Sequence, residues 1–356
     1  MTELSDLPLR EELRGMEPYG APQPDVPVRL NVNENTHAIP ESVATEVVTA
    51  VARAVLELNR YPDREFTALR ESLAGYLGHG LTAAQLWAAN GSNEVLQHVL
   101  QAFGGPGRSV LGFPPTYSMY PLLAAGTHTR WVTAQRDAGY AISPQTAVTA
   151  IERERPDVVF FCTPNNPTGT PVPLETIEAA YQATDGIVLV DEAYAEFSDA
   201  PSGLTLLPGR PRLLVSRTMS KAFAFAGARL GYLAADAAVA DALRLVRLPY
   251  HLSALTPAAA IAALGQAQIM LATVADIVAQ RNRISAALPE LGYEPVPTAS
   301  NFVLFGGMAE PRRVFEALLA DGVIVRETGI PGHLRVTAGT EAETTMFLDC
   351  LAKIEQ

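Results

Sequence analysis

The chain has 356 residues, of which 48% are hydrophobic and 18% charged, and its formal net charge is −12. This composition can build a packed core and lacks the bias of a disordered protein. The negative charge argues against a nucleic-acid-binding protein, because phosphate backbones require clustered Lys and Arg. We therefore expect a globular protein of one large domain or, more often at this length, two domains.

The first thirty residues are rich in Pro and Gly, which indicates an extended arm rather than a domain. Residues 1–6 show neither a basic segment nor an apolar run, so we expect no secretory signal. No uncharged apolar stretch approaches the roughly 18 residues that span a bilayer. Two cysteines, Cys162 and Cys350, are too few for a disulfide framework or a structural zinc site. These features predict a cytoplasmic protein with reduced thiols, no bound metal and no membrane partner.

Helical periods alternate with short apolar segments from about Pro40 onward. Such alternation predicts a parallel sheet covered by helices. The pattern changes after His251, where we expect one long Ala-rich helix over about residues 257–288 and then a small α+β unit. Strands are predicted at 110–113, 129–133, 158–162, 187–191, 213–217 and 229–234 in the sheet, and at 301–305, 323–326 and 333–337 in the small unit.

Three of the predicted strands run into segments with polar and charged side chains. Each segment alone has an ordinary explanation, such as a turn fixed by Pro and Gly or a lysine whose stem lies along the surface. Their succession is informative because ligands of open α/β sheets bind at the carboxyl ends of the strands. An amine beside a Gly-rich stretch that ends in Arg suits a nucleophile next to a bound anion. In chain order, the segments carry Asn166, then Asp191 with Tyr194, then Lys221 with Arg229.

With these residues the chain resembles the fold-type I pyridoxal-phosphate aminotransferases, and most closely the histidinol-phosphate aminotransferases. The likeness extends from Leu7 to Thr340. It is specific because several separated motifs agree in order and spacing, whereas aminotransferases in general share only some of them. Besides the three segments above, the motifs are LNVNEN at 30–35, NRYPD at 59–63, NGSNE at 90–94 and PTY at 115–117.

The resemblance implies an α/β fold with two domains. A large cofactor-binding domain, residues 31–250, would hold a mostly parallel sheet covered by helices. A small α+β domain, residues 251–356, would be joined by the arm formed by residues 1–30. The cofactor would be pyridoxal phosphate, which draws electrons from the substrate Cα into its ring most effectively when the ring nitrogen is protonated.

The resemblance also assigns the residues around the cofactor ring. Asp191 matches the acid that stabilises the protonated ring nitrogen, although an Asp that caps a turn after a strand is common. Tyr194 and Asn166 match groups that approach the ring oxygen. Tyr117 matches the aromatic residue that stacks on the ring, with a core aromatic as the ordinary alternative.

Phosphate ligands are implied at three places. Residues 91–94 precede a helical run, and a helix N-terminus offers N–H groups and a favourable dipole to an anion, although Ser and Asn there are also ordinary caps. Tyr61 matches a residue that reaches the phosphate of the neighbouring subunit's cofactor, which implies a homodimer with shared active sites; packing at a turn is the alternative. The implied ligands are Ser92, Asn93, Thr218, Ser220, Arg229 and, from the partner subunit, Tyr61.

Lys221 matches the lysine that binds the cofactor covalently. Once the substrate amine displaces it, the same amine serves as the base that moves the Cα proton. A second half-reaction passes the amino group to a keto acid, which gives ping-pong kinetics. Lys221 is therefore the expected catalytic residue.

Substrate recognition is implied by arginines and by the arm. Arg335 matches the arginine that anchors an acidic end of the substrate, and Arg326 matches a second arginine associated with histidinol phosphate. A surface salt bridge is a fair alternative for Arg326. Tyr19 matches an arm residue that closes over the substrate phosphate, and Asn166 is expected to contact substrate as well as cofactor.

The chain departs from the family pattern at Thr36, where a proline usually follows Asn35 directly. Threonine removes a φ restraint and restores a backbone N–H, so we expect a more mobile loop. We interpret the next residue, His37, as a loop histidine that faces solvent.

The resemblance implies small-molecule substrates and a transaminase of histidine biosynthesis. It would interconvert L-histidinol phosphate and 2-oxoglutarate with imidazole-acetol phosphate and L-glutamate. An aromatic amino-acid aminotransferase is the closest alternative, because relatives share the lysine, aspartate and arginine motifs. A pyridoxal-phosphate decarboxylase of a phosphorylated amino acid is an alternative of another reaction class. The intact set of Lys221, Asp191, Tyr194 and Arg335 argues against a third one, a catalytically silent binding protein.

Overall fold

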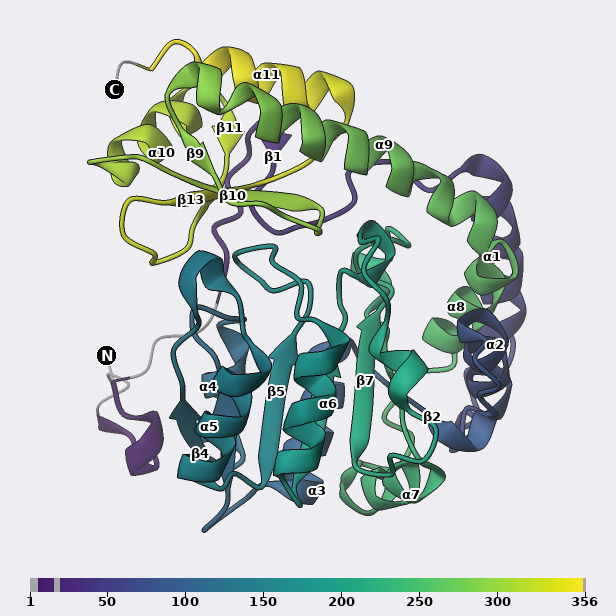
Figure 1. Ribbon diagram of the computed structural model, residues 1–356. Coiled ribbons are helices and arrows are strands. Elements are labelled where there is room, and N and C mark those ends of the chain that lie inside the picture. The colour runs from purple at the N-terminus through teal and green to yellow at the C-terminus, as the bar shows by residue number, and fades with distance from the viewer. Residues whose placement is uncertain (1–5, 16–19, 355–356) are drawn as a thin grey trace.

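A seven-stranded sheet forms the centre of the larger part of the molecule (Figure 1). The computed structural model describes residues 6–15 and 20–354. The strand order is β2-β8-β7-β6-β5-β3-β4, and within this sheet β8 alone runs against its neighbours. The mostly parallel sheet expected from the sequence is confirmed. Its strands are β2 Leu86–Ala89, β3 Ser109–Gly112, β4 Arg130–Thr133, β5 Val158–Cys162, β6 Ile187–Asp191, β7 Leu213–Thr218 and β8 Gly231–Ala234.

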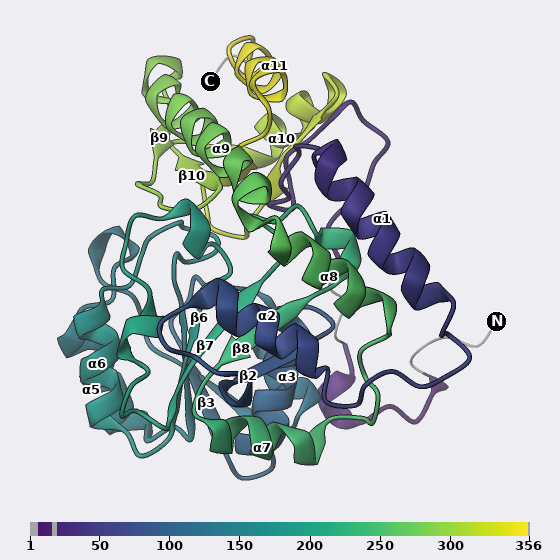
Figure 2. The ribbon, with the colours of Figure 1, turned by 90° about the vertical axis from the view of Figure 1, so that its right-hand side faces the viewer.

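Helices cover both faces of this sheet. Figure 2 shows α5 and α6 on one face and α3 on the other. Because they lie between helices, β5 and β6 are buried along their whole length, and their uninterrupted apolar runs follow from that position. The helices of this part are α1 Glu41–Val55, α2 Thr67–Leu77, α3 Ser92–Phe103, α4 Met119–Gly126, α5 Pro144–Glu154, α6 Leu174–Ala183, α7 Ala237–Val246 and α8 Leu255–Gly265.

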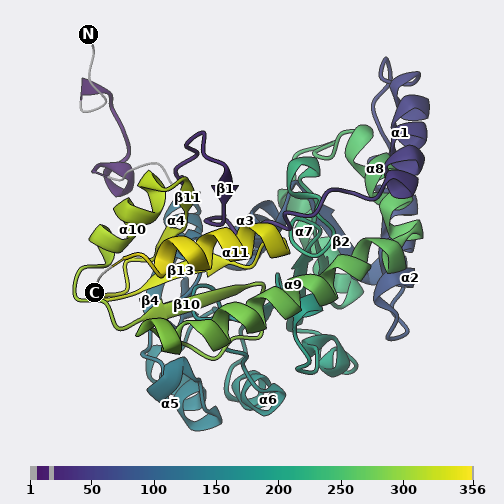
Figure 3. The same cartoon turned by 90° about the horizontal axis from the view of Figure 1, so that it is seen from above.

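A smaller antiparallel sheet lies above the carboxyl ends of the central strands (Figure 1). Its order is β12-β13-β10-β9, and a separate parallel pair joins β1 to β11. Seen from above, α9 and α11 run across this sheet (Figure 3). The elements are β1 Val28–Arg29, β9 Glu294–Pro295, β10 Phe302–Gly306, β11 Val323–Ile324, β12 Arg326–Glu327, β13 Leu334–Thr337, α9 Ala267–Ala287, α10 Pro311–Ala320 and α11 Glu341–Leu351.

Two apolar cores hold these layers together. The first fills the space between the central sheet and its helices, and it includes Ala260 and Ala263 of α8. The second packs the small sheet against α9, α10 and α11, and it includes Val28 and Leu30 from the start of the chain. The division of the chain at residues 30 and 250 stays a prediction.

The single long helix expected over residues 257–288 is wrong. Two helices, α8 and α9, are bent by 76° at a break. Gln266 lies at this break with φ −117 and ψ 27, directly after Gly265, and it caps both helices. The bend has a physical reason, because α8 packs in the first core whereas α9 supplies Ile277 and Ile284 to the second. Three strands, β1, β2 and β9, were not predicted, and residues 323–326 divide between β11 and β12.

Within residues 6–15 and 20–354, no single helix is long and apolar enough to cross a membrane. The one pair in these ranges that passes together by length and composition is Leu255–Gly265 with Ala267–Leu291, the same bent pair. Short 3-10 helices lie at Glu11–Leu13, Ala83–Gln85, Ala138–Tyr140, Ala195–Phe197, Gly203–Leu206, Ala226–Ala228 and Pro289–Leu291.

Candidate active site

One cavity gathers nearly all of the predicted site residues. It lies where the carboxyl ends of β5, β6 and β7 meet the segment after β1 and the small sheet. In an open α/β sheet this end is where ligands bind. The predicted residues that line the cavity are Ser92, Asn93, Tyr117, Asn166, Asp191, Tyr194, Thr218, Ser220, Lys221, Arg229, Arg326 and Arg335.

Two predicted residues are not placed in this cavity. Tyr61 is 80% exposed and stacks on Tyr250, with ring centroids 4.6 Å apart. It does not line the cavity of its own chain, so its predicted role depends on a second subunit. Tyr19 lies outside the described residues.

Lys221 follows β7 and carries the amine at the centre of the cavity. Its Nζ donates a hydrogen bond to the Val32 carbonyl oxygen at 2.9 Å. Burial lowers the pKa of this amine to about 8; the positive charges of Arg335 and Arg229 act in the same direction, and Glu34 opposes them. A lowered pKa raises the neutral fraction near neutral pH, and the neutral form is the nucleophile.

Asp191 ends β6 and is 2% exposed. Its Oδ2 accepts a hydrogen bond from the Tyr120 hydroxyl at 2.8 Å, and its Oδ1 accepts one from the Ser216 hydroxyl at 3.2 Å. Burial raises the pKa of this carboxyl to about 6, although both hydroxyls favour the ionised form. A buried carboxylate of this kind favours a proton on a ligand group beside it.

Tyr194 is the meeting point of two amides. Its hydroxyl oxygen accepts hydrogen bonds from Asn33 Nδ2 at 2.9 Å and from Asn166 Nδ2 at 3.3 Å. Arg335 donates from Nη1 to Asn166 Oδ1 at 2.5 Å and from Nη2 to the Asn31 carbonyl oxygen at 2.8 Å. Burial raises the pKa of Tyr194, which keeps the phenol protonated. This network joins the end of β6 to β13 of the small sheet.

Two glycines shape the anion-binding end of the cavity. A Cβ on Gly231 would lie 2.2 Å from the backbone nitrogen of Ser92, so only glycine lets β8 approach the start of α3 this closely. Gly91 has φ +88, and a Cβ there would lie 2.5 Å from Arg229 Nη2. Arg229 Nη1 also lies 3.5 Å from Ser220 Oγ. A helix N-terminus, a guanidinium and a hydroxyl thus converge, which is a donor set for a phosphate.

Several residues around the site were missed by sequence reasoning. Asn33 lies in a motif that was recognised, and its φ of 57 is a left-handed conformation that Asn tolerates. Tyr120 follows Tyr117 by three residues, a spacing that could have suggested a shared face if both were helical, but α4 begins only at Met119. Ser216 lies within β7, and nothing in the sequence around it indicates a role in the site. Cys162 lines the cavity at the end of β5.

The loop at Thr36 is held by its neighbours. Thr36 Oγ1 accepts a hydrogen bond from the Thr340 N–H at 3.1 Å. The expected mobility of this loop stays a prediction. His37 was expected to face solvent, but its Nε2 is buried without a hydrogen-bond partner among the described residues, so that expectation is wrong. The reason is local, because Asn35 bonds to the Ala222 carbonyl oxygen and to the His37 N–H and thereby draws the loop inward.

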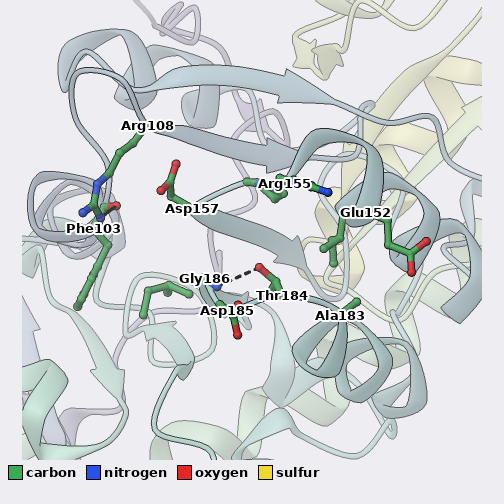
Figure 4. A pocket seen from close by; sticks show the side chains of 12 residues that line it. Phe103, Arg108, Glu152, Arg155, Asp157, Ala183, Thr184, Asp185 and Gly186 are labelled. Atoms are coloured by element: carbon green, nitrogen blue, oxygen red, sulfur yellow. Dashed lines mark hydrogen bonds between the residues drawn. The ribbon is translucent and has the colours of Figure 1, made fainter.

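A second hollow lies at the opposite ends of the central strands (Figure 4). It measures about 860 Å³ and is lined by the starts of β5 and β6 and the ends of α5 and α6. Gly186 donates its N–H to Thr184 Oγ1 at 3.0 Å there. Arg108 and Arg155 share its wall with Asp157 and Asp185, so charges of both signs are mixed. None of the predicted site residues lies in it, and size alone does not mark the functional site.

Comparisons with known proteins agree with this geometry. Residues 25–351 match the family model described as "Aminotransferase class I and II". The histidinol-phosphate aminotransferase of Paenarthrobacter aurescens (strain TC1) is 59% identical over 356 residues, which cover 99% of this chain and 96% of that protein. That of Corynebacterium glutamicum (strain R) is 53% identical, with 99% of this chain and 97% of that protein covered.

A solved structure is similar over the same length. The crystal structure of histidinol-phosphate aminotransferase from Sinorhizobium meliloti in complex with pyridoxal-5'-phosphate superimposes with a TM-score of 0.87 at 25% identity, covering 97% of each chain. The fold, the family match and the relatives lead to one conclusion. The chain belongs to the class I and II aminotransferase family.

Proposed function

We propose that this protein is a pyridoxal-phosphate-dependent aminotransferase of histidine biosynthesis. It interconverts L-histidinol phosphate and 2-oxoglutarate with imidazole-acetol phosphate and L-glutamate. The names of relatives that are 52–59% identical over nearly the whole chain support this assignment. The observation that carries it is the convergence of an amine, a buried carboxylate and three arginines in one cavity.

The residues present fit pyridoxal phosphate. The cradle at Gly91, Ser220 and Arg229 offers donors to its phosphate. Asp191 suits the ring nitrogen, because its two hydroxyl donors favour the carboxylate form against the opposing effect of burial. When bound, the cofactor supplies an electron sink for the substrate Cα. The phosphate cradle and Asp191 would hold it at its two ends, and the Lys221 amine would bind it covalently and carry the Cα proton.

Around the ring we propose further roles. Tyr194 and Asn166, already joined by a hydrogen bond, face the ring oxygen. Tyr117 stacks on the ring, while Ser92, Asn93 and Thr218 complete the phosphate site. The position of each side chain in the cavity supports these roles.

Substrate selection falls to the two arginines of the small sheet. Arg326 on β12 and Arg335 on β13 are direct cross-strand partners, and both line the cavity. Side chains of such partners lie on the same face of a sheet. Two guanidinium groups side by side suit a substrate with a phosphate dianion better than one with an aromatic ring alone. Tyr19, proposed to close over this phosphate, lies in the arm.

The substrate assignment is tested by single half-reactions with histidinol phosphate and with phenylalanine. We expect histidinol phosphate to react at least roughly a hundredfold faster, because a site built for a polar group discriminates against an analogue that lacks it. Arg326→Gln is expected to slow histidinol phosphate selectively. Equal rates for the two substrates would remove the narrow assignment. Release of carbon dioxide without consumption of a keto acid would indicate a decarboxylase.

We further propose a homodimer in the cytoplasm, with Tyr61 reaching the phosphate site of the partner subunit. Tyr61 is exposed and stacks on Tyr250. Their neighbours in the sequence Leu56, Leu58 and Leu248 are exposed as well, and we call these five residues the apolar patch. Exposed apolar patches commonly mark protein interfaces. A second copy of the chain would cover the patch and complete the cofactor site.

Separated monomers are therefore expected to bind pyridoxal phosphate poorly. Sedimentation velocity across a dilution series, combined with cofactor titration, measures both properties on the same samples. Tyr61→Phe, which keeps the ring but removes the hydroxyl, should preserve the dimer and weaken the binding of the cofactor. A monomer with full cofactor affinity would contradict the shared site. Cell fractionation tests the location.

A further inference from the structure

The carboxylate of Asp191 is held by two side chains that do not line the cavity. Tyr120 on α4 is fully buried and donates its hydroxyl proton to Asp191 Oδ2 at 2.8 Å. Ser216 on β7 is also fully buried and donates to Oδ1 at 3.2 Å. Each carboxylate oxygen thus has its own donor, and these two donors, which do not line the cavity, fix the plane of the carboxylate.

Tyr120 is itself fixed by its surroundings. Its N–H donates to the Tyr117 carbonyl oxygen at 3.1 Å, and the two rings meet edge to face with centroids 5.5 Å apart. The ring of Phe160, on β5, packs against Tyr120 in the same manner at 5.1 Å. The start of α4 and the residues just before it therefore carry both the residue proposed to stack on the cofactor and the residue that holds Asp191.

We propose that Tyr120, assisted by Ser216, is a positioning residue that keeps Asp191 ionised and aimed at the cofactor ring nitrogen. By this means it sets the fraction of that nitrogen that carries a proton. The inference rests on the proposed function. Its chemical basis is that donation to a carboxylate favours the ionised form, whereas burial without donors favours the neutral acid.

Other groups near Asp191 do not change charge in the relevant range. Burial raises the pKa of the Tyr120 phenol well above its usual value, so this hydroxyl acts only as a donor. Burial also raises the pKa of the Cys162 thiol to about 12. Arg136 faces Cys162 and Tyr120 and stays charged, because burial lowers its pKa only to about 10. Glu192 is paired with Arg217 at 2.8 Å.

The test is a pH titration of the visible absorbance of the bound cofactor in the wild type and in Tyr120→Phe. A positive charge on the ring nitrogen lowers the pKa of the nearby covalent link to Lys221, because like charges disfavour each other. Without the Tyr120 hydroxyl, Asp191 is expected to be ionised less, and the titration midpoint should rise by roughly 0.3 to 1 pH unit. This shift is a fraction of what one hydrogen bond to a charged group contributes. Ser216→Ala should shift it in the same direction.

A matched control and a modified cofactor separate this role from a structural one. Tyr232→Phe removes a buried hydroxyl that has no hydrogen-bond partner among the described residues, and it should leave the midpoint unchanged. With a cofactor analogue that carries C–H in place of the ring nitrogen, the difference between wild type and Tyr120→Phe should vanish. An unchanged midpoint with pyridoxal phosphate, or the same shift with both cofactors, would overturn the proposal.

Two further outcomes are distinguishable. Urea unfolding of the apoprotein shows whether Tyr120→Phe folds, and if it does not, Ser216→Ala carries the test with the same two cofactors. A wild-type protein that forms no absorbing complex with pyridoxal phosphate would contradict the proposed function instead.

Discussion

Lys221→Ala is expected to abolish transamination while the protein stays folded. The amine both binds the cofactor and moves the Cα proton in the proposed function, so its loss should slow turnover by at least roughly 10⁴-fold. Its hydrogen bond to the Val32 carbonyl oxygen is a small part of the fold. The rate of each half-reaction and the urea unfolding curve measure the two expectations separately.

The composition of the chain makes this test unusually clean. Lys221 and Lys353 are the only lysines among the 356 residues. Lys353→Ala is therefore the matched control, and it should keep full activity. Borohydride reduction of the cofactor-loaded protein, followed by peptide mass spectrometry, should place the label on Lys221 alone. Retained transamination in Lys221→Ala, or a label on Lys353, would defeat the assignment.

Asp191→Asn is expected to lower activity and to stabilise the apoprotein. Asparagine cannot hold the ring nitrogen in its protonated form, so we expect a loss of roughly 10²- to 10³-fold in the proton-transfer step, comparable to removing one electrostatic stabiliser. Stability should change in the opposite direction. Active sites often retain a buried charge that costs folding free energy.

The pH dependence follows from the sign of the shift. Burial raises the pKa of Asp191 from 3.8 to about 6, so between these values the folded protein binds more protons than the unfolded chain. The free energy of unfolding therefore falls as the pH rises through this window, by roughly 3 kcal/mol in total. At pH 8 apo Asp191→Asn should be more stable than the wild type by up to that amount, and the gain should fade toward pH 4.

Urea denaturation of the apoproteins at several pH values, at one fixed protein concentration, measures this difference. Asp276→Asn, an exchange at an exposed helical position, is the control and should change stability little. An apo Asp191→Asn that is less stable than the wild type at pH 8 would show that the two hydroxyl donors outweigh the cost of burial.

The sequence predicted those parts of the fold that depend on local pattern. The strands at 158–162 and 187–191 coincide with β5 and β6, because strands buried on both faces are continuous apolar runs. Asp191 ends a predicted strand, and Asn166 and Lys221 lie a few residues after two others, so their meeting at one edge of the sheet could be inferred. The bend at Gln266 could not, because it depends on two cores that compete for one Ala-rich segment.

The sequence also did not predict side chains that contact site residues without lining the cavity. Tyr120 reads as a core aromatic, and only the packing of α4 against β5 and β6 brings its hydroxyl to Asp191. Arg326 and Arg335 were identified separately, but residues 323–326 were predicted as a single strand. That prediction hides the pairing of β12 with β13 that makes Arg326 and Arg335 directly opposed residues.

This pairing of Arg326 with Arg335 has an energetic consequence for the empty protein. Like charges on directly opposed residues destabilise a strand pair. An anionic ligand bound beside these two residues would lower the repulsion between their charges. A ligand that binds only the folded state also stabilises that state. Binding of an anionic ligand would therefore also stabilise the small sheet that forms one wall of the cavity.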